Sequence, residues 1–293
     1  MKKKLNVGAS PIWRNDEWYI LDHKVSTTKD NVIVGEAKKI PLDDGDCQLL
    51  FCSHMIEHIP HIELGPIFSE FNRVLEMGGI VRILSPDLFI LAKAYVEKDE
   101  EFFKKVLSED ENVRTDLGMG GMLMNLIVSP GQDTALFNRQ LNKFISGYGH
   151  IYLYDFDMLN TILSDYGFEV TRKQFCESEI EDFHEPLHVQ GLEPVWQDLN
   201  QAFYKKNDLV HYYDEKDGRY NINFTVTGFD RDPLMSLIVE AKKVANVSEK
   251  PDSDNDSQAE NYNRYGNSLL KDKKFATKVK LFESISKVID EID

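Results

Sequence analysis

Two short segments of the chain combine histidine and glutamate at spacings that could hold a metal ion. Residues 54–58 follow the pattern H-x-x-E-H and residues 184–188 the pattern H-E-x-x-H, and two histidines one helical turn apart can turn both imidazoles toward one zinc ion. Pro186 lies inside the second segment, where proline removes a backbone donor and clashes with the preceding turn. In the first segment His54 is expected to end a strand, and Pro60 follows too closely for a regular helix. A zinc-dependent hydrolase is therefore the least favoured hypothesis, and no metal ligand is assigned.

The histidines can do acid–base chemistry instead of binding a metal. An imidazole has an unperturbed pKa of about 6.5, so it can accept a proton from a hydroxyl group near neutral pH. His54 and Asp87 stand at the ends of two predicted strands, and His150 follows a segment flanked by glycines. We therefore predict His54 or His150 as a general base, with Asp87 as the carboxylate that orients it or binds the substrate. The alternative is that both histidines only pack or bind substrate.

A compact run of strands and one helix must position these side chains. Residues 32–37, 48–54 and 79–87 are apolar segments bounded by turn residues or proline, which is typical of buried strands. Residues 62–78 carry apolar side chains at helical spacing, with a pair of glycines as the stop. Strand, helix and strand joined by short links predict a parallel α/β sheet with right-handed crossovers.

Ligands bind at the carboxyl ends of the strands in sheets of this kind. The polar residues predicted at these ends are Glu36, Ser53, His54, Ser85 and Asp87. Upstream, residues 5–10 are predicted to form a strand that runs into small residues, and residues 18–22 a strand that ends on Asp22. Small residues let a ligand approach the backbone, and the Asp22 carboxylate could accept hydrogen bonds from a ribose diol.

Composition narrows the class of protein. The 293 residues include 34 Lys and Arg against 50 Asp and Glu, a net charge of −16, whereas a duplex-binding surface needs clustered Lys and Arg. Nucleic acid is therefore not an expected partner. Three cysteines without paired spacing predict neither a disulfide framework nor a zinc knuckle. The start lacks the apolar stretch of a signal peptide, and no run reaches the roughly 18 apolar residues of a membrane span. We expect a soluble, cytoplasmic protein with one α/β domain and an appendage.

Taken in order, these segments resemble the class I, Rossmann-like S-adenosylmethionine-dependent methyltransferases. The resemblance is nearest to short-motif bacterial members that are often encoded near polysaccharide genes, and it covers about residues 4–243. The stretches that carry it are residues 5–11, Asp22, and residues 35–42, 53–59, 73–79, 85–88, 150–155, 165–168 and 236–242. Ser10 stands where the family usually has a second glycine.

The resemblance implies a Rossmann-like, mostly parallel sheet flanked by helices, with S-adenosyl-L-methionine as cofactor. Gly8 and Ser10 would flank the methionine part of the cofactor, Asp22 the ribose, and Glu36 with Ala37 the adenine edge. Asn6, Ala9 and Ser53 complete the implied cofactor-binding set. The implied reaction is methyl transfer to a small acceptor, favoured to be a hydroxyl on a sugar or glycan precursor. The alternative is a non-catalytic binding or scaffold protein on the same fold.

Composition also predicts how the chain is divided. Residues 1–243 are expected to form the methyltransferase domain, with residues 199–235 as an insertion before the last strand. Residues 244–265 are predicted to be a polar linker, and residues 266–293 an amphipathic C-terminal helix. A lone amphipathic helix cannot bury its own apolar stripe, so we expect it to dock on the body or on a second copy in a homodimer. Within the domain, residues 89–107 and 155–166 are predicted helices, and residues 118–124 a mobile flap or flexible connection.

Overall fold

The computed structural model describes residues 2–9, 13, 15–22, 31–106, 117–128, 137–138, 143–144, 150–184, 187, 213–214, 219–220 and 232–247. The chain divides into two compact units, residues 1–247 and residues 248–293. The predicted C-terminal helix, most of the predicted linker and most of the insertion at residues 199–235 lie outside the described residues. Where the chain is described, no helix combines the length and the apolar character needed to cross a membrane.

A seven-stranded sheet organises the first unit, in the order β3-β2-β1-β4-β5-β11-β8. Its strands are β1 (Lys3–Val7), β2 (Tyr19–Asp22), β3 (Val32–Val34), β4 (Cys47–Ser53), β5 (Leu75–Pro86), β8 (Phe168–Lys173) and β11 (Ser236–Lys243). The first five strands run parallel to one another, and β11 is antiparallel to both of its neighbours, β5 and β8. The fold is therefore Rossmann-like and mostly parallel, as predicted.

Helices and short strands complete the described chain. The helices are η1 (Ile56–His58), η2 (His61–Glu63), α1 (Leu64–Val74), α2 (Leu88–Val96), α3 (Glu100–Val106), α4 (Gly118–Val128), α6 (Phe156–Asp165), η4 (Glu181–Phe183) and α9 (Asp232–Met235). Two-residue strands form the pairs β6 (Phe137–Asn138) with β7 (Lys143–Phe144), and β9 (Tyr213–Asp214) with β10 (Arg219–Tyr220). Asp155 caps α6 by accepting a hydrogen bond from the Met158 amide at 2.9 Å, which explains where that helix begins.

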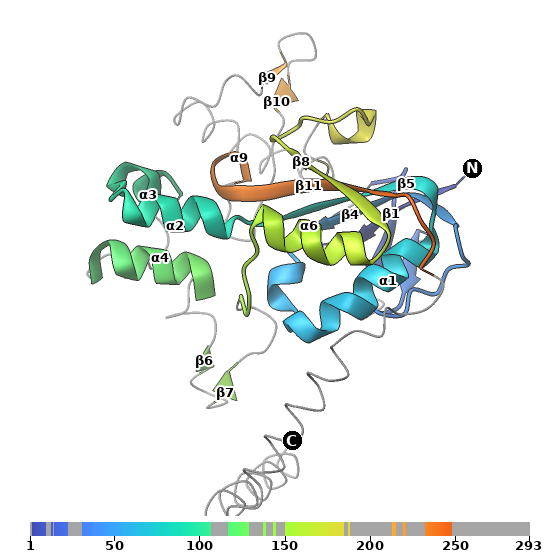
Figure 1. Cartoon of the computed structure of the whole chain (residues 1–293), viewed down its shortest axis with the longest axis horizontal. Helices are drawn as coiled ribbons and strands as arrows, with labels where there is room; N and C mark the ends of the chain where they lie inside the picture. Colours follow the sequence, from blue (N-terminus) through green and yellow to red (C-terminus); the bar gives the residue numbers. More distant parts are fainter. Residues whose placement is uncertain are drawn as a thin grey trace, which may run out of the picture. The chain divides into compact units, whose positions relative to one another are not determined.

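The core lies on both faces of the sheet, because successive residues of a strand point to opposite sides. In β4, Leu50 and Cys52 pack into the larger cluster with the apolar faces of α1 and α6, which cover one face of the sheet in Figure 1. Leu49 and Phe51 point the other way, into a second cluster around Trp18. A third cluster joins α2, α3 and α4 to one another, and these helices form their own group in Figure 1.

Two predicted helix boundaries and one predicted segment differ from the structure, and backbone pairing or conformation explains the two boundaries. Helix α1 ends at Val74 instead of Gly78, because Leu75 is extended, fully buried and paired with Cys47 in the sheet. The predicted helix at residues 89–107 is two helices, since Lys98 takes a positive φ of 58° and Asp99 accepts a hydrogen bond from the Phe102 amide at the start of α3. Residues 118–124 form most of α4 instead of a flap or a flexible connection.

Candidate functional site

The strands that were predicted to carry the site end together at one edge of the sheet. Val7 lies opposite Leu21 of β2 on one side and Cys52 of β4 on the other. The residues that follow, Gly8, Asp22 and Ser53, are therefore level with one another on three neighbouring strands, which lie about 4.8 Å apart in a sheet. This edge brings together a glycine, a carboxylate and a hydroxyl, as the sequence predicted.

Gly8 occupies a backbone conformation and a space that suit only glycine. Its φ is +82°, and a Cβ atom added there would meet the Met55 side chain at 3.0 Å. Gly8 is also exposed, so a ligand can approach the main chain directly after β1. Asn6 is buried within β1 and Ala9 packs against the second cluster, whereas Ser10 lies outside the described residues.

Replacing Gly8 by alanine is expected to lower the free energy of unfolding by about 1–2 kcal/mol, because an L-residue with positive φ is strained. Urea unfolding measures the change. Gly120→Ala is the matched control, since Gly120 lies inside α4 and its nearest neighbour to an added Cβ is the Tyr95 hydroxyl at 3.9 Å. That variant should be stabilised by about 0.5–1 kcal/mol. Equal stability of the wild type and Gly8→Ala would contradict the prediction.

The acidic residues predicted to touch a cofactor lie along the same edge. Asp22 ends β2, and its carbonyl accepts a hydrogen bond from the Gly35 amide at 2.9 Å, which ties the ends of β2 and β3 together. The Glu36 side chain is 63% exposed and lies 3.6 Å from the Lys38 ammonium. Ala37 packs against the larger cluster. A carboxylate this exposed can reach a ligand beyond the strand ends.

Two buried hydroxyl groups have no hydrogen-bond partner among the described residues. They are the Oγ atoms of Ser53, the last residue of β4, and of Ser85 in β5. Ser53 lies opposite Leu84, so the two serines stand close to the carboxyl ends of adjacent strands. A buried polar atom without a partner is rare and calls for an explanation, such as a bound ligand.

His54 directly follows β4 and forms a pair with Glu57. Its φ of 49° is unusual for a residue other than glycine, and such conformations concentrate at functional sites. The His54 Nδ1 lies 3.0 Å from the Glu57 Oε1, and the Glu57 side chain is fully buried. Burial by itself raises the pKa of the Glu57 carboxyl, but the hydrogen bond with His54 and the nearby imidazoles outweigh it, so that pKa lies below its usual value. Glu57 is therefore held as a carboxylate.

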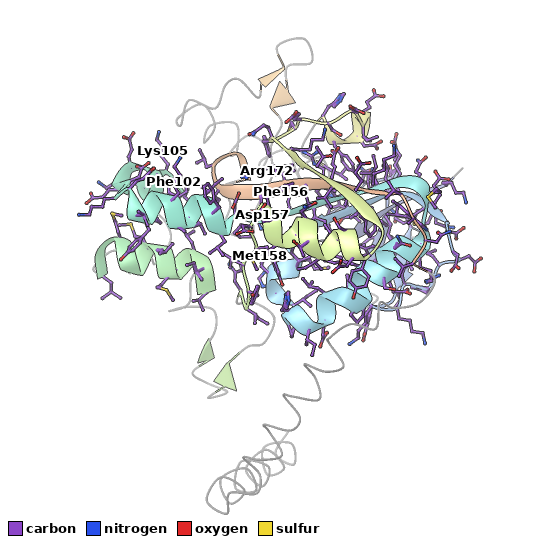
Figure 2. All side chains as sticks on the ribbon, viewed as in Figure 1. Phe102, Lys105, Phe156, Asp157, Met158 and Arg172 are labelled. Atoms are coloured by element: carbon purple, nitrogen blue, oxygen red, sulfur yellow. The ribbon has the colours of Figure 1, made fainter. Side chains whose placement is uncertain are left out.

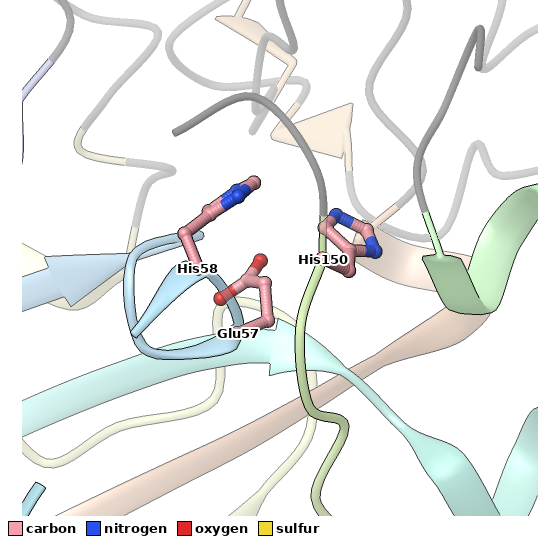
Figure 3. A group of neighbouring side chains, drawn as sticks. All are labelled: Glu57, His58 and His150. Atoms are coloured by element: carbon pink, nitrogen blue, oxygen red, sulfur yellow. The ribbon is translucent and has the colours of Figure 1, made fainter. Parts of the chain in front are cut away.

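His150 comes from a distant part of the chain to the same place. Its Nδ1 lies 2.9 Å from the Leu126 carbonyl, which belongs to the last turn of α4, and its ring centroid lies 5.0 Å from that of His58. Burial lowers the pKa of His150 to about 4. Figure 3 shows the Glu57 carboxylate between the imidazoles of His58 and His150. From the sequence, Glu57 was predicted only as part of a zinc motif, without a role of its own.

Asp87 is engaged by the ends of two other elements. It is fully buried, accepts a hydrogen bond from the Phe89 amide at 2.9 Å at the start of α2, and pairs with the guanidinium of Arg172 in β8 at 2.6 Å. Arg172 is labelled in Figure 2. Burial raises the pKa of Asp87, and the positive charge of Arg172 opposes that increase. These contacts account for a structural role, and the predicted role in orienting a base stays a prediction.

The second histidine motif is only partly described. The His184 Nε2 lies 2.9 Å from the Ser178 carbonyl, next to the short helix η4. Glu185 and His188 lie outside the described residues. In the first motif, η1 is a three-residue 3-10 helix, and His54, which precedes this helix, contacts Glu57 within it.

One segment of the chain is similar in sequence to known methyltransferases. Residues 19–83, which run from β2 into β5, match the family described as a methyltransferase domain. No curated protein matches the chain.

Among solved structures, the chain is similar to an S-adenosylmethionine-dependent methyltransferase from Archaeoglobus fulgidus, with 15% identity, a TM-score of 0.38, and 83% of this chain and 86% of that chain covered. It is also similar to one from Methanosarcina mazei, with 11% identity and a TM-score of 0.41, and with 83% of this chain and 92% of that chain covered. A third such methyltransferase, from Mesorhizobium loti, has 10% identity and a TM-score of 0.39, and 82% of this chain and 90% of that chain are covered.

Proposed function

We infer that this chain is a methyltransferase that uses S-adenosylmethionine, and we propose that its acceptor is a hydroxyl group, favoured to be on a sugar or glycan precursor. The inference depends above all on one observation. Gly8, Asp22 and Ser53 stand level at the carboxyl edge of β1, β2 and β4, and the match to the methyltransferase domain includes two of these strands. In open α/β sheets ligands bind at this edge.

The residues present fit the cofactor. Gly8 is exposed directly after β1, which suits close approach of the methionine part to the main chain. The Asp22 carboxylate suits the ribose hydroxyls, and the exposed Glu36 with Ala37 suits the adenine edge. Ser53 offers a buried hydroxyl that has no hydrogen-bond partner among the described residues. When bound, the cofactor supplies a methyl group activated by its sulfonium. The protein must then position the acceptor and handle its proton.

His54 is the residue that we assign as general base. An alcohol hydroxyl is a poor nucleophile until its proton is removed, so transfer to it needs a base. Glu57 contacts the Nδ1 atom of His54 at 3.0 Å, and its buried carboxylate would stabilise the imidazolium that forms when His54 takes the acceptor's proton. His150 is a weaker candidate because its pKa is lowered to about 4, far below the range in which a base works best at neutral pH.

The surroundings of this pair support a ring-shaped acceptor. Tyr152 is 41% exposed, stacks on His61 with ring centroids 5.0 Å apart, and contacts Tyr154 at 5.1 Å. The Tyr152 amide donates a hydrogen bond to the Glu57 carbonyl at 3.3 Å, so the aromatic group is tied to the catalytic pair. An aromatic face with polar tips packs well against the carbon–hydrogen face of a sugar ring and can still bond its hydroxyls.

We expect S-adenosylhomocysteine to raise the melting temperature of the wild type, because a ligand that binds only the folded state stabilises it. Asp22→Ala should bind this ligand about 10- to 150-fold more weakly, which corresponds to the roughly 1.5–3 kcal/mol of a charge-assisted hydrogen bond. Calorimetric titration measures both affinities.

Asp43→Ala is the matched control, since Asp43 is an exposed acid that precedes β4 at the opposite end of that strand. It should bind the ligand as the wild type does. Absence of any thermal shift in the wild type at millimolar ligand would favour the non-catalytic scaffold over the methyltransferase.

A further inference from the structure

We propose that Glu57, His58 and His150 form a binding site for a divalent transition-metal ion, with Zn²⁺ as the ion that suits them best. Each residue offers one ligand atom, and these three atoms all lie within 4.8 Å of one another (Figure 3). Two imidazoles and one carboxylate are a known ligand set of catalytic zinc sites, which keep a fourth position open. No metal ligand was predicted from the sequence, because the strand end at His54 and the nearby Pro60 leave little room for a helix that would turn His54 and His58 toward one ion.

The geometry needs only a small adjustment to close around an ion. Zinc bonds to nitrogen and oxygen are about 2.0–2.1 Å long, so ligand atoms in a tetrahedral site lie about 3.4 Å apart. His58 and His150 are both half-buried, and rotation of their rings moves the nitrogen atoms by this difference. Imidazole and carboxylate ligands together favour zinc and its neighbours over magnesium or calcium, which prefer oxygen ligands throughout.

The two oxygens of Glu57 have different surroundings. Oε1 lies 3.0 Å from the His54 Nδ1, whereas Oε2 is buried and has no hydrogen-bond partner among the described residues. A buried carboxylate oxygen without a partner is costly, since it has lost its water and gained nothing in exchange. A cation between His58 and His150 would satisfy this oxygen. His54 then becomes the outer partner that orients the ligating carboxylate, as is usual around metal ions.

The tautomer of His150 also suits a metal ligand. A carbonyl oxygen can only accept a hydrogen bond, so the contact of Nδ1 with the Leu126 carbonyl at 2.9 Å places the hydrogen on Nδ1. The Nε2 atom therefore keeps its lone pair. Histidines that bind metals almost always donate their other ring N–H in this way, to a backbone carbonyl or a carboxylate.

Backbone contacts hold the two ligand-bearing segments together. The amides of Ile151 and Tyr152 both donate to the Glu57 carbonyl, at 2.7 and 3.3 Å. The segment that carries His150 is thus fastened to the short helix that carries Glu57 and His58. Ligands held in this way lose little conformational freedom when an ion binds, which favours affinity.

The ion would stand next to the assigned base. Its open position could take the acceptor hydroxyl and lower the pKa of that hydroxyl, which makes proton removal by His54 easier. This consequence depends on the proposed function, whereas binding of the ion does not.

The test is calorimetric titration of the full-length protein with zinc chloride after treatment with a chelator and dialysis. We expect the wild type to bind one ion per chain at the proposed site. His58→Gln and His150→Gln should each bind zinc at least about 100-fold more weakly. Removing a metal ligand lowers the affinity for the metal at least as much as removing a residue that hydrogen-bonds to a ligand. His184→Gln, which removes an imidazole outside the site, is the matched control and should bind as the wild type does. Cobalt(II) is a second probe, whose visible absorption reports a tetrahedral site directly.

Two results would overturn the proposal: a wild type that binds no zinc, or a wild-type zinc affinity retained in both ligand variants. The second result would identify the binding as adventitious. Circular dichroism and melting temperature establish that each variant is folded, and one folded ligand variant is enough for the decision. The titration contains no S-adenosylmethionine and the S-adenosylhomocysteine titration contains no zinc, so failure of the metal site and failure of the proposed function are distinguishable.

Discussion

Replacing His54 by glutamine is expected to lower the turnover of methyl transfer by about 10²- to 10⁴-fold while the affinity for S-adenosylhomocysteine stays at its wild-type value. Glutamine keeps the approximate size and polarity of the side chain but cannot accept a proton near neutral pH. The affinity is expected to stay the same because the substitution leaves unchanged the residues assigned to the cofactor, Gly8, Asp22 and Ser53, at the ends of β1, β2 and β4.

The measurement pairs steady-state turnover, with an acceptor found by screening sugars and glycan precursors, with calorimetric titration of the cofactor product. His184→Gln is the control, since it removes a histidine whose Nε2 lies 2.9 Å from a backbone carbonyl outside the site. His150→Gln, assayed in metal-free buffer, decides between the two candidate bases. If it alone loses turnover, His150 is the base. If both variants keep near-normal turnover, catalysis rests on positioning alone.

The second large effect concerns stability. Arg82→Met is expected to lower the free energy of unfolding by about 3–5 kcal/mol, because it leaves a buried carboxylate without its partner. Arg82 and Glu240 face each other across β5 and β11 and are only 4% and 7% exposed. Arg82 also donates to the Glu177 carbonyl at 2.9 Å. Burial lowers the pKa of Arg82, and the charge of Glu240 opposes that decrease.

Urea unfolding of the single and double variants measures this effect. Arg82→Met combined with Glu240→Leu should recover part of the lost stability, since it removes both buried charges of the pair and leaves only Lys173, which is 15% exposed and lies 3.9 Å from Glu240, without its carboxylate. Lys104→Met is the control, because Lys104 pairs with Glu100 on the surface, where both side chains are mostly exposed, and its loss should hardly change the unfolding midpoint. A single variant as stable as the wild type would show that this pair contributes little.

The sequence alone predicted the central strands of the sheet and the edge at which the proposed site residues stand. Residues 48–54 and 79–87 were predicted to be strands from their apolar runs, and β4 and β5 cover most of them. Gly8, Asp22 and Ser53 could be placed at one edge without coordinates, because parallel strands share a direction and their carboxyl ends meet. These predictions succeed because strand and helix periods depend on local patterns of side chains.

Only the tertiary structure decided which side chains meet at the site. The spacing of residues 54–58 suggested that two histidines share a helical face, but His54 contacts Glu57, and His58 meets His150 from a distant segment. The ends of helices and strands also depend on tertiary contacts. Leu75 belongs to a strand and not to the preceding helix because it pairs with Cys47 in the sheet. The spacing of apolar residues predicts which face of a helix or strand is buried, whereas contacts between distant segments depend on how the helices and strands pack. The choice between a base, a metal ligand and a structural histidine therefore had to come from the folded chain.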